Sequence, residues 1–216
     1  MKLQVKVKGS AYSGNYGHAG IPGSVGGSAP RGGSGFQTFP NAEKAESYAM
    51  ENLGGNVGTT AVNKKVVDNY RVYGMAINSA LRKDKPLYDP IYQADRTNQN
   101  TLDRLDELMN LPEAIVSKGV TVQRGFGDIT PGPGLPRVKF FADKAVGDVF
   151  QDKGFVSTSV DPDFRWQKGT MVTIRVPPGA RGLYIGRKEK EFLLNRGTSF
   201  RVVQNDTNGI ILEVIP

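Results

Sequence analysis

The segment that decides the fold reads Gly154-Phe155-Val156-Ser157-Thr158-Ser159, and two short runs of the same kind flank it. The run before it is Val122-Gln123-Arg124-Gly125, and the run after it is Glu189-Lys190-Glu191-Phe192-Leu193-Leu194-Asn195-Arg196-Gly197. Each run is β-prone and carries polar or charged groups that an ordinary core strand avoids. We interpret all three as strands that present functional groups.

The carboxylates of the last run stand two residues apart, at Glu189 and Glu191. At the start of a strand, this spacing predicts that both side chains emerge on the same face. A charged surface turn over residues 187–191 is the alternative interpretation, because runs of charge usually form a solvated face.

The other two runs also have a second interpretation. Arg124 ends an apolar strand, where its planar fork of donors suits a pyrophosphate, but a solvated arginine or an ion-pair partner fits there too. Ser157 and Ser159 alternate along a strand and so share one face, which is equally typical of a polar edge strand.

In this order, over residues 122–197, the three runs resemble the Arg, Ser-Thr-Ser and Glu-x-Glu motifs of the mono-ADP-ribosyltransferases related to bacterial actin-modifying toxins. The resemblance implies an enzyme that transfers ADP-ribose from NAD to a side chain of a target protein. It assigns to Glu191 the stabilisation of positive charge on the ribose, and to Glu189 the orientation of the acceptor. Ser157 would position the catalytic glutamate. Glu at position 189, where other members have Gln, indicates an arginine acceptor.

The resemblance also implies a set of NAD contacts. Arg124 would bind the pyrophosphate, and Gly125 would let the backbone approach the ligand closely. From the loop after the serine strand, Phe164 would stack on the nicotinamide ring and Arg165 would reach a phosphate. The implied contacts are Arg124, Gly125, Ser157, Thr158, Ser159, Phe164, Arg165, Asn78 and Tyr73.

Asn78 and Tyr73 belong to a predicted helix with Ile-Asn and Leu-Arg pairs like those of the family's N-terminal helix. The family's aromatic residue four positions before the asparagine falls on Gly74 in this chain, and Tyr73 stands one place away.

The order of elements predicts an α+β fold. Helical spacing of apolar residues covers 41–53, about 61–82 and 101–109. Short strands follow, which we expect at 120–124, 155–159, 171–176, 192–194, 200–203 and 210–215. No Walker sequence or Gly-x-Gly-x-x-Gly strand-helix motif is present. The resemblance accordingly implies N-terminal helices packed on a two-sheet mixed β core that forms an NAD cleft.

We expect two regions, a glycine-rich and flexible segment over residues 1–39 and a catalytic domain over residues 40–216. Residues 9–36 are rich in glycine and poor in apolar side chains, so they have little to bury. Residues 14–28 also resemble a segment of phage head-morphogenesis proteins.

Composition excludes several classes of function. The chain has no cysteine and one histidine, which excludes disulfides, thiolate chemistry and Cys- or His-based metal sites, and we expect no metal. The net charge of +7 is spread along the chain without a nucleic-acid-binding motif, so we expect no nucleic-acid partner.

No apolar run is long enough for a membrane span. Residues 1–8 alternate polar and apolar positions, unlike a signal peptide. We expect a protein that is cytoplasmic in its producer, or that reaches a target cell by a non-general secretion route or by phage injection.

Three functions remain open at this point. The first is an arginine-specific mono-ADP-ribosyltransferase. The second is an NAD glycohydrolase, which needs Glu191 but not Glu189. The third is a non-catalytic phage structural or injected protein, against which the presence of Arg124, Ser157 and both glutamates argues.

Overall fold

The computed structural model describes residues 35–87, 96–127, 139–165, 169–186 and 188–216. They belong to one compact unit, Ser34–Pro216. The flexible segment that we predict lies, up to residue 34, outside the described residues. Its last residues contact the body, because Gln37 forms an isolated parallel bridge with Val120 and the Phe39 ring lies 5.0 Å from that of Tyr48.

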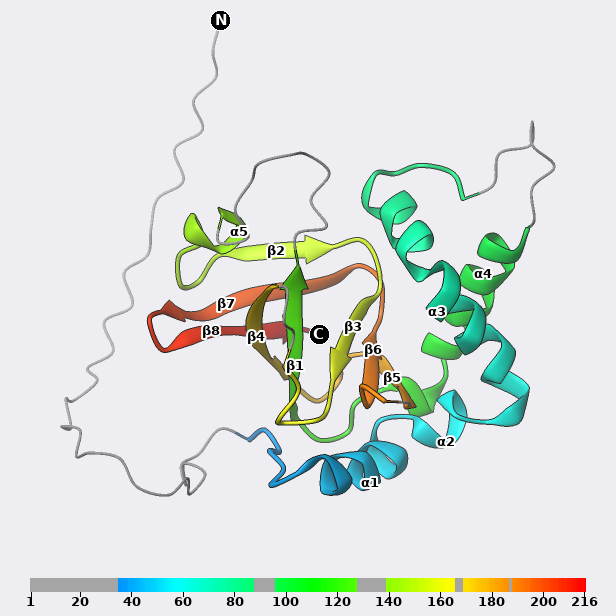
Figure 1. Cartoon of the computed structure of the whole chain (residues 1–216), viewed down its shortest axis with the longest axis horizontal. Coiled ribbons are helices and arrows are strands. Elements are labelled where there is room, and N and C mark those ends of the chain that lie inside the picture. The colour runs from blue at the N-terminus through cyan, green and yellow to red at the C-terminus, as the bar shows by residue number, and fades with distance from the viewer. Residues whose placement is uncertain (1–34, 88–95, 128–138, 166–168, 187) are drawn as a thin grey trace, which may run out of the picture. The chain divides into compact units, whose positions relative to one another are not determined.

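The unit begins with helices and continues with strands, as the sequence predicts, and the short helix α5 stands between two of the strands (Figure 1). The helices are α1 (Ala42–Asn52), α2 (Gly55–Gly58), α3 (Ala61–Arg82), α4 (Thr97–Met109), α5 (Lys139–Ala142) and the 3-10 helix η2 (Pro112–Ala114). The strands are β1 (Val120–Gly127), β2 (Val149–Asp152), β3 (Val156–Ser159), β4 (Gly169–Val176), β5 (Gly182–Gly186), β6 (Glu191–Leu194), β7 (Thr198–Asp206) and β8 (Gly209–Ile215). Among the described residues, no helix is both long and apolar enough to cross a membrane.

The strands form one eight-stranded mixed sheet in the order β2-β7-β8-β4-β1-β3-β6-β5. We expected two packed sheets, but hydrogen-bonded pairing runs through all eight strands. The junction in the middle is short. β1 pairs with β4 from Val120 to Gly127, whereas it pairs with β3 only at Gln123, opposite Ser159. The strands β3, β6 and β5 therefore form a distinct part of the sheet.

Helix α3 is the longest element, with 22 residues. It begins after Thr60, whose hydroxyl accepts a hydrogen bond from the Asn63 backbone amide at 3.3 Å and so satisfies a free helix N–H group. Its inward stripe has helical spacing and includes Val67, Tyr70 and Ile77, all at most 3% exposed. This stripe directs one face of α3 into the core.

Two hydrophobic clusters stabilise the unit. The first joins α1 to the strands through buried residues such as Ala45, Val122 and Phe192. The second joins α3 and α4 to β5, β6 and Phe155, the residue just before β3. In Figure 1, α3 and α4 lie beside the part of the sheet that β3, β6 and β5 form. The long helix therefore adjoins β3 and β6, the strands of the Ser-Thr-Ser and Glu-x-Glu motifs.

Candidate active site

The sheet places the three motifs on adjacent strands. β3 lies between β1, which carries Arg124, and β6, which carries Glu191 (Figure 1). Gln123 stands opposite Ser159, and Ser159 stands opposite Glu191. Residues far apart in the sequence are thus brought to one site by strand pairing.

Arg124 is half-buried, and its guanidinium is only partly satisfied by the protein. Its Nη1 donates to the carbonyl of Ser157 at 2.5 Å, and its guanidinium carbon lies 4.8 Å from the centre of the Phe126 ring. Its Nε is buried and has no hydrogen-bond partner among the residues that the structure describes. Burial lowers the pKa of the Arg124 guanidinium, and nearby Asp152 opposes that shift. A buried cation with an unused donor is suited to an anionic ligand.

The hydroxyls of the Ser-Thr-Ser strand contact the glutamate strand and its turn. Thr158 Oγ1 donates to the Phe192 carbonyl at 2.6 Å, and Ser159 Oγ donates to the Glu189 carbonyl at 2.5 Å. Both side chains are buried. The motif therefore fixes the backbone on both sides of Glu191.

The two glutamates differ in their surroundings. Glu191 begins β6 and its side chain is 13% exposed, whereas Glu189 is exposed on the preceding turn. Lys190 between them has a left-handed φ of 49°. The prediction that both carboxylates emerge on one strand face was wrong, because the strand starts only at Glu191. The alternative of a surface turn thus describes Glu189 but not Glu191.

Helix α1 holds this turn from outside the sheet. Glu46 forms an ion pair with Lys190 and accepts a hydrogen bond from the hydroxyl of Tyr184 at 3.1 Å. Burial, with Glu46 beside it, raises the pKa of Tyr184. The backbone amide of Val160 adds a bond to the Lys190 carbonyl at 3.1 Å.

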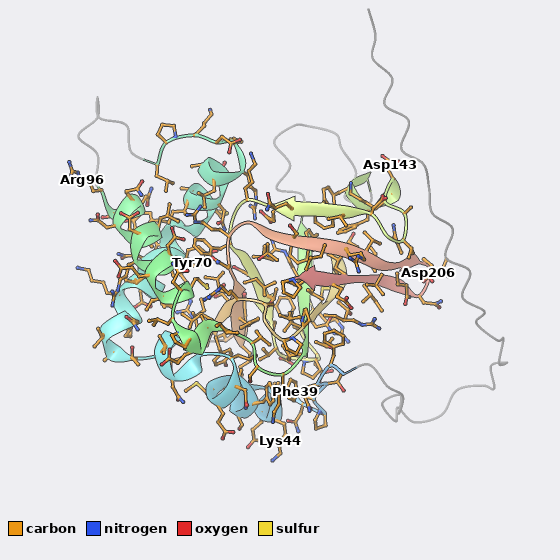
Figure 2. All side chains as sticks on the ribbon, turned by 180° about the vertical axis from the view of Figure 1, so that it is seen from behind. Phe39, Lys44, Tyr70, Arg96, Asp143 and Asp206 are labelled. Carbon is orange, nitrogen blue, oxygen red and sulfur yellow. The ribbon has the colours of Figure 1, made fainter. Side chains whose placement is uncertain are left out.

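Tyr70, labelled in Figure 2, joins α3 to the motif strands. Its hydroxyl accepts from Asn78 Nδ2 at 3.0 Å. Burial raises the pKa of Tyr70, and the Ser157 side chain lies close enough to oppose that shift. A Cβ at Gly74 would lie 3.2 Å from its ring, so Tyr70 occupies the space beside the position where the family pattern places its aromatic residue.

Asn78 is placed behind the site, with both ends of its amide bound to the protein. Besides its bond to Tyr70, its Oδ1 accepts from the backbone amide of Phe155 at 2.9 Å. A Cβ at Gly154 would lie 2.9 Å from that oxygen, so only glycine fits there without a shift. Asn78 thus fixes the start of β3 against α3.

Three predicted contacts have no recorded bond to the motif residues. Tyr73 is 37% exposed. It follows Arg71 by two residues on α3, so it points about 200° around the helix from Arg71. Arg165 is exposed, and its Nη1 donates to the carbonyls of Pro162 and Phe164 within its own loop. Phe164 is half-buried, and the continuation of this loop, 166–168, lies outside the described residues.

Arg71 and Arg82 are site residues that sequence reasoning missed. Arg71 Nε lies 3.6 Å from Glu191 Oε2. Arg82 forms a two-point ion pair with Asp152, at 2.7 and 2.9 Å, and its charge also acts on Arg124. The two arginines are eleven residues apart on α3, which places them on the same face of the helix. This spacing was the sequence signal that could have assigned both to the site.

The described residues contain no group of three or more His, Cys, Asp or Glu side chains that could hold a metal ion. Two cavities, of about 350 and 220 Å³, are not lined by Arg124, by the Ser-Thr-Ser residues or by the two glutamates. The motif strands and their turn present a guanidinium, hydroxyls and carboxylates, and the guanidinium of Arg124 is suited to an anionic ligand.

An α+β fold that gathers an arginine, a hydroxyl strand and a glutamate pair beside a long helix defines the Arg/Ser-Thr-Ser/Glu-x-Glu class of ADP-ribosyltransferase. The chain belongs to the ADP-ribosyltransferase exoenzyme family, whose model matches residues 41–213. Sequence comparison with curated proteins finds no relative.

Solved structures share the fold. Plx2a, an ADP-ribosyltransferase toxin from Paenibacillus larvae, has a TM-score of 0.62 at 18% identity, covering 81% of this chain and 96% of its own. C3stau2 from S. aureus, solved with NAD, has a TM-score of 0.60 at 17% identity, covering 84% and 98%. The ADP-ribosyltransferase Vis, solved with agmatine, has a TM-score of 0.52 at 20% identity, covering 81% and 83%.

Proposed function

We propose that this protein is a mono-ADP-ribosyltransferase that transfers ADP-ribose from NAD to an arginine side chain of a target protein and releases nicotinamide. The observation that carries this proposal is the unpartnered, buried Nε of Arg124, in the same site as Glu191. A pyrophosphate would supply the missing acceptor and the opposite charge. The NAD-bound structure of C3stau2 adds support from a protein of the same fold.

The chemistry follows from the two carboxylates. When the bond between nicotinamide and ribose breaks, nicotinamide leaves with the bonding electrons and positive charge develops on the ribose, as in glycoside cleavage. Glu191, 13% exposed, places a fixed negative charge where it can stabilise that state. An acceptor nitrogen then bonds to the ribose carbon and loses a proton, for which Glu189 is the base.

The choice of arginine rests on the turn. Glu189 is exposed, so its carboxylate is accessible to a group that belongs to another protein. A guanidinium matches a carboxylate in charge and in the geometry of its donors. Agmatine, which is bound in the Vis structure, carries the same guanidinium group as arginine.

The test uses labelled NAD, a cell lysate as the source of acceptors, and two variants. Glu191→Gln should abolish both protein labelling and NAD hydrolysis, because the charge opposite the ribose is lost. Glu189→Gln should abolish labelling but leave much of the hydrolysis, because water needs less orientation than a guanidinium. Glu213→Gln on β8 is the control and should match the parent.

Two results would count against the proposal. Labelling by Glu189→Gln at the parent level would remove the arginine assignment. NAD cleavage by Glu191→Gln at the parent rate would remove the transferase assignment altogether.

An NAD glycohydrolase is the second candidate function. It is favoured by the contrast between the enclosed Glu191, which it requires, and the exposed Glu189, which it does not. Free ADP-ribose without labelled protein in the same assay would identify it.

We place the target protein in another cell, in keeping with an exoenzyme family. We also propose that the N-terminal segment derives from a phage protein, because residues 14–28 resemble a segment of phage head-morphogenesis proteins.

A further inference from the structure

The turn between β5 and β6 carries Glu189 and leads directly into Glu191. Two donors hold the backbone of the turn. The Ser159 hydroxyl bonds the Glu189 carbonyl, and the Val160 amide bonds the Lys190 carbonyl. Glu46 holds the middle of the turn through Lys190. These contacts fix the backbone, but none of them reaches the carboxylate of Glu191.

Arg71 contacts both ends of this turn. At the entrance, its Nη2 donates to the carbonyl of Ile185 at 2.9 Å and to that of Gly186 at 3.3 Å. At the exit, its Nε lies 3.6 Å from Oε2 of Glu191. One planar side chain from α3 therefore joins the end of β5 to the carboxylate at the start of β6.

The ion pair is well enclosed. The Arg71 side chain is 14% exposed and that of Glu191 is 13% exposed. Water therefore screens this pair less than the exposed pairs of the surface. The guanidinium is itself held by two carbonyls, so it attracts the carboxylate from a fixed position. A carboxylate that stabilises a developing charge must be held in place before the reaction.

All three nitrogens of Arg71 face groups of the protein, Nη2 at hydrogen-bond distances and the other two at ion-pair distances. Nη2 bonds the two carbonyls, Nε faces Glu191, and Nη1 lies 3.7 Å from Oδ1 of Asp68 on the same helix. Arg124, by contrast, keeps a buried Nε without a partner. The two arginines therefore differ in role, since one has a donor left for a ligand and the other is committed to the fold around Glu191.

We propose that Arg71 is a positioning residue, whose guanidinium fork orients the Glu191 carboxylate by tying it to the end of β5 across the turn. This inference rests on the proposed function, because it assigns to Arg71 an effect on the step that Glu191 carries. Arg71 acts through Glu191 and does not bind NAD.

The experiment compares Arg71→Met, which keeps much of the apolar stem but removes the charge and the donors, with Arg71→Lys, which keeps the stem and the charge but not the planar fork. Lys64→Met is the matched control, because Lys64 pairs with Asp68 on the same helix but is largely exposed. For each variant, kcat and KM are measured for nicotinamide release. The dissociation constant for NAD is measured separately in a Glu191→Gln background.

In Arg71→Met we expect kcat to fall about 10- to 100-fold, the scale of a small misplacement of a catalytic group, with the NAD dissociation constant within about twofold of the parent. Arg71→Lys should recover part of kcat, because it restores the charge but not the fork. Lys64→Met should match the parent. A general structural role would lower the amount of folded enzyme without this division between kcat and binding.

A parent-level kcat in Arg71→Met would overturn the proposal, as would a loss confined to NAD binding, which would make Arg71 a ligand contact instead. If Arg71→Met does not fold, Arg71→Lys decides, with a lowered kcat in support and a parent-level kcat against. If the parent itself releases no nicotinamide, the proposed function fails and this inference falls with it. If the parent is active and only the Arg71 result is negative, the proposed function stands.

Discussion

Replacing Arg124 with lysine should weaken NAD binding while leaving the positive charge in place. Arg124 uses one donor on the carbonyl of Ser157 and retains a buried Nε without a partner. A lysine ammonium is a single point of charge, so it cannot bond Ser157 and present a planar pair of donors to a pyrophosphate at once. The variant therefore loses at least one charge-assisted hydrogen bond to the ligand.

The expected magnitude follows from that one bond. A hydrogen bond to a charged group contributes about 1.5–3 kcal/mol. At about 1.4 kcal/mol for each factor of ten, the NAD dissociation constant should rise roughly 10- to 150-fold.

The assay is isothermal titration of NAD into Arg124→Lys in a Glu191→Gln background, so that the ligand is not consumed. Arg175→Lys is the control, because Arg175 is also half-buried and lies on β4, opposite Thr121 of β1. An NAD dissociation constant in Arg124→Lys that stays within about twofold of the parent would remove Arg124 from the binding site.

Three predictions concern stability. Tyr70→Phe leaves Nδ2 of Asn78 without its acceptor and should lower the free energy of unfolding in urea by about 1–3 kcal/mol. Burial raises the pKa of Tyr184 in the folded chain, so as pH rises the hydroxyl loses its proton first in the unfolded chain. The free energy of unfolding should therefore fall as pH rises above about 10, and it should fall less steeply in Tyr184→Phe. Gly182→Ala places a Cβ 2.4 Å from the Phe192 ring and should destabilise the fold by about 1–3 kcal/mol, measured by thermal unfolding.

Each of these has a control and a contrary result. Tyr73→Phe changes an exposed hydroxyl, and Gly35→Ala adds a methyl where no atom lies within 4 Å, so both should match the parent. An unchanged urea midpoint in Tyr70→Phe would contradict the role of its hydroxyl. Equal slopes with pH in the parent and Tyr184→Phe, or an unchanged melting temperature in Gly182→Ala, would contradict the other two.

Local sequence signals predicted the helices better than the strands. The bounds of α3, Ala61–Arg82, are those expected from its apolar spacing, because a long periodic pattern outweighs local propensity. Strand β5, Gly182–Gly186, was missed, because all five residues are buried and the run shows neither alternation nor length. Strand β2, Val149–Asp152, was missed because it is a four-residue edge strand.

The sequence singles out the motif residues but does not predict how they are arranged. Arg124, Ser159 and Glu191 become neighbours through the order β1-β3-β6, which pairs strands that are not consecutive. Arg71 and Glu46 contact the glutamate turn from separate helices, and no periodicity in the sequence links a helix residue to a distant turn. Such contacts are set by tertiary packing.

Helix α3 acts as a spacer of fixed length. Arg71, Asn78 and Arg82 reach the β5–β6 turn, the start of β3 and the end of β2 respectively. They are separated by seven and four residues, so they lie along one side of the helix over about 16 Å. One inserted or deleted residue between Arg71 and Arg82 would turn one end by about 100° relative to the other and separate an arginine from its strand. Natural variation in this segment should therefore occur by substitution, and changes in length should be confined to the connections outside it.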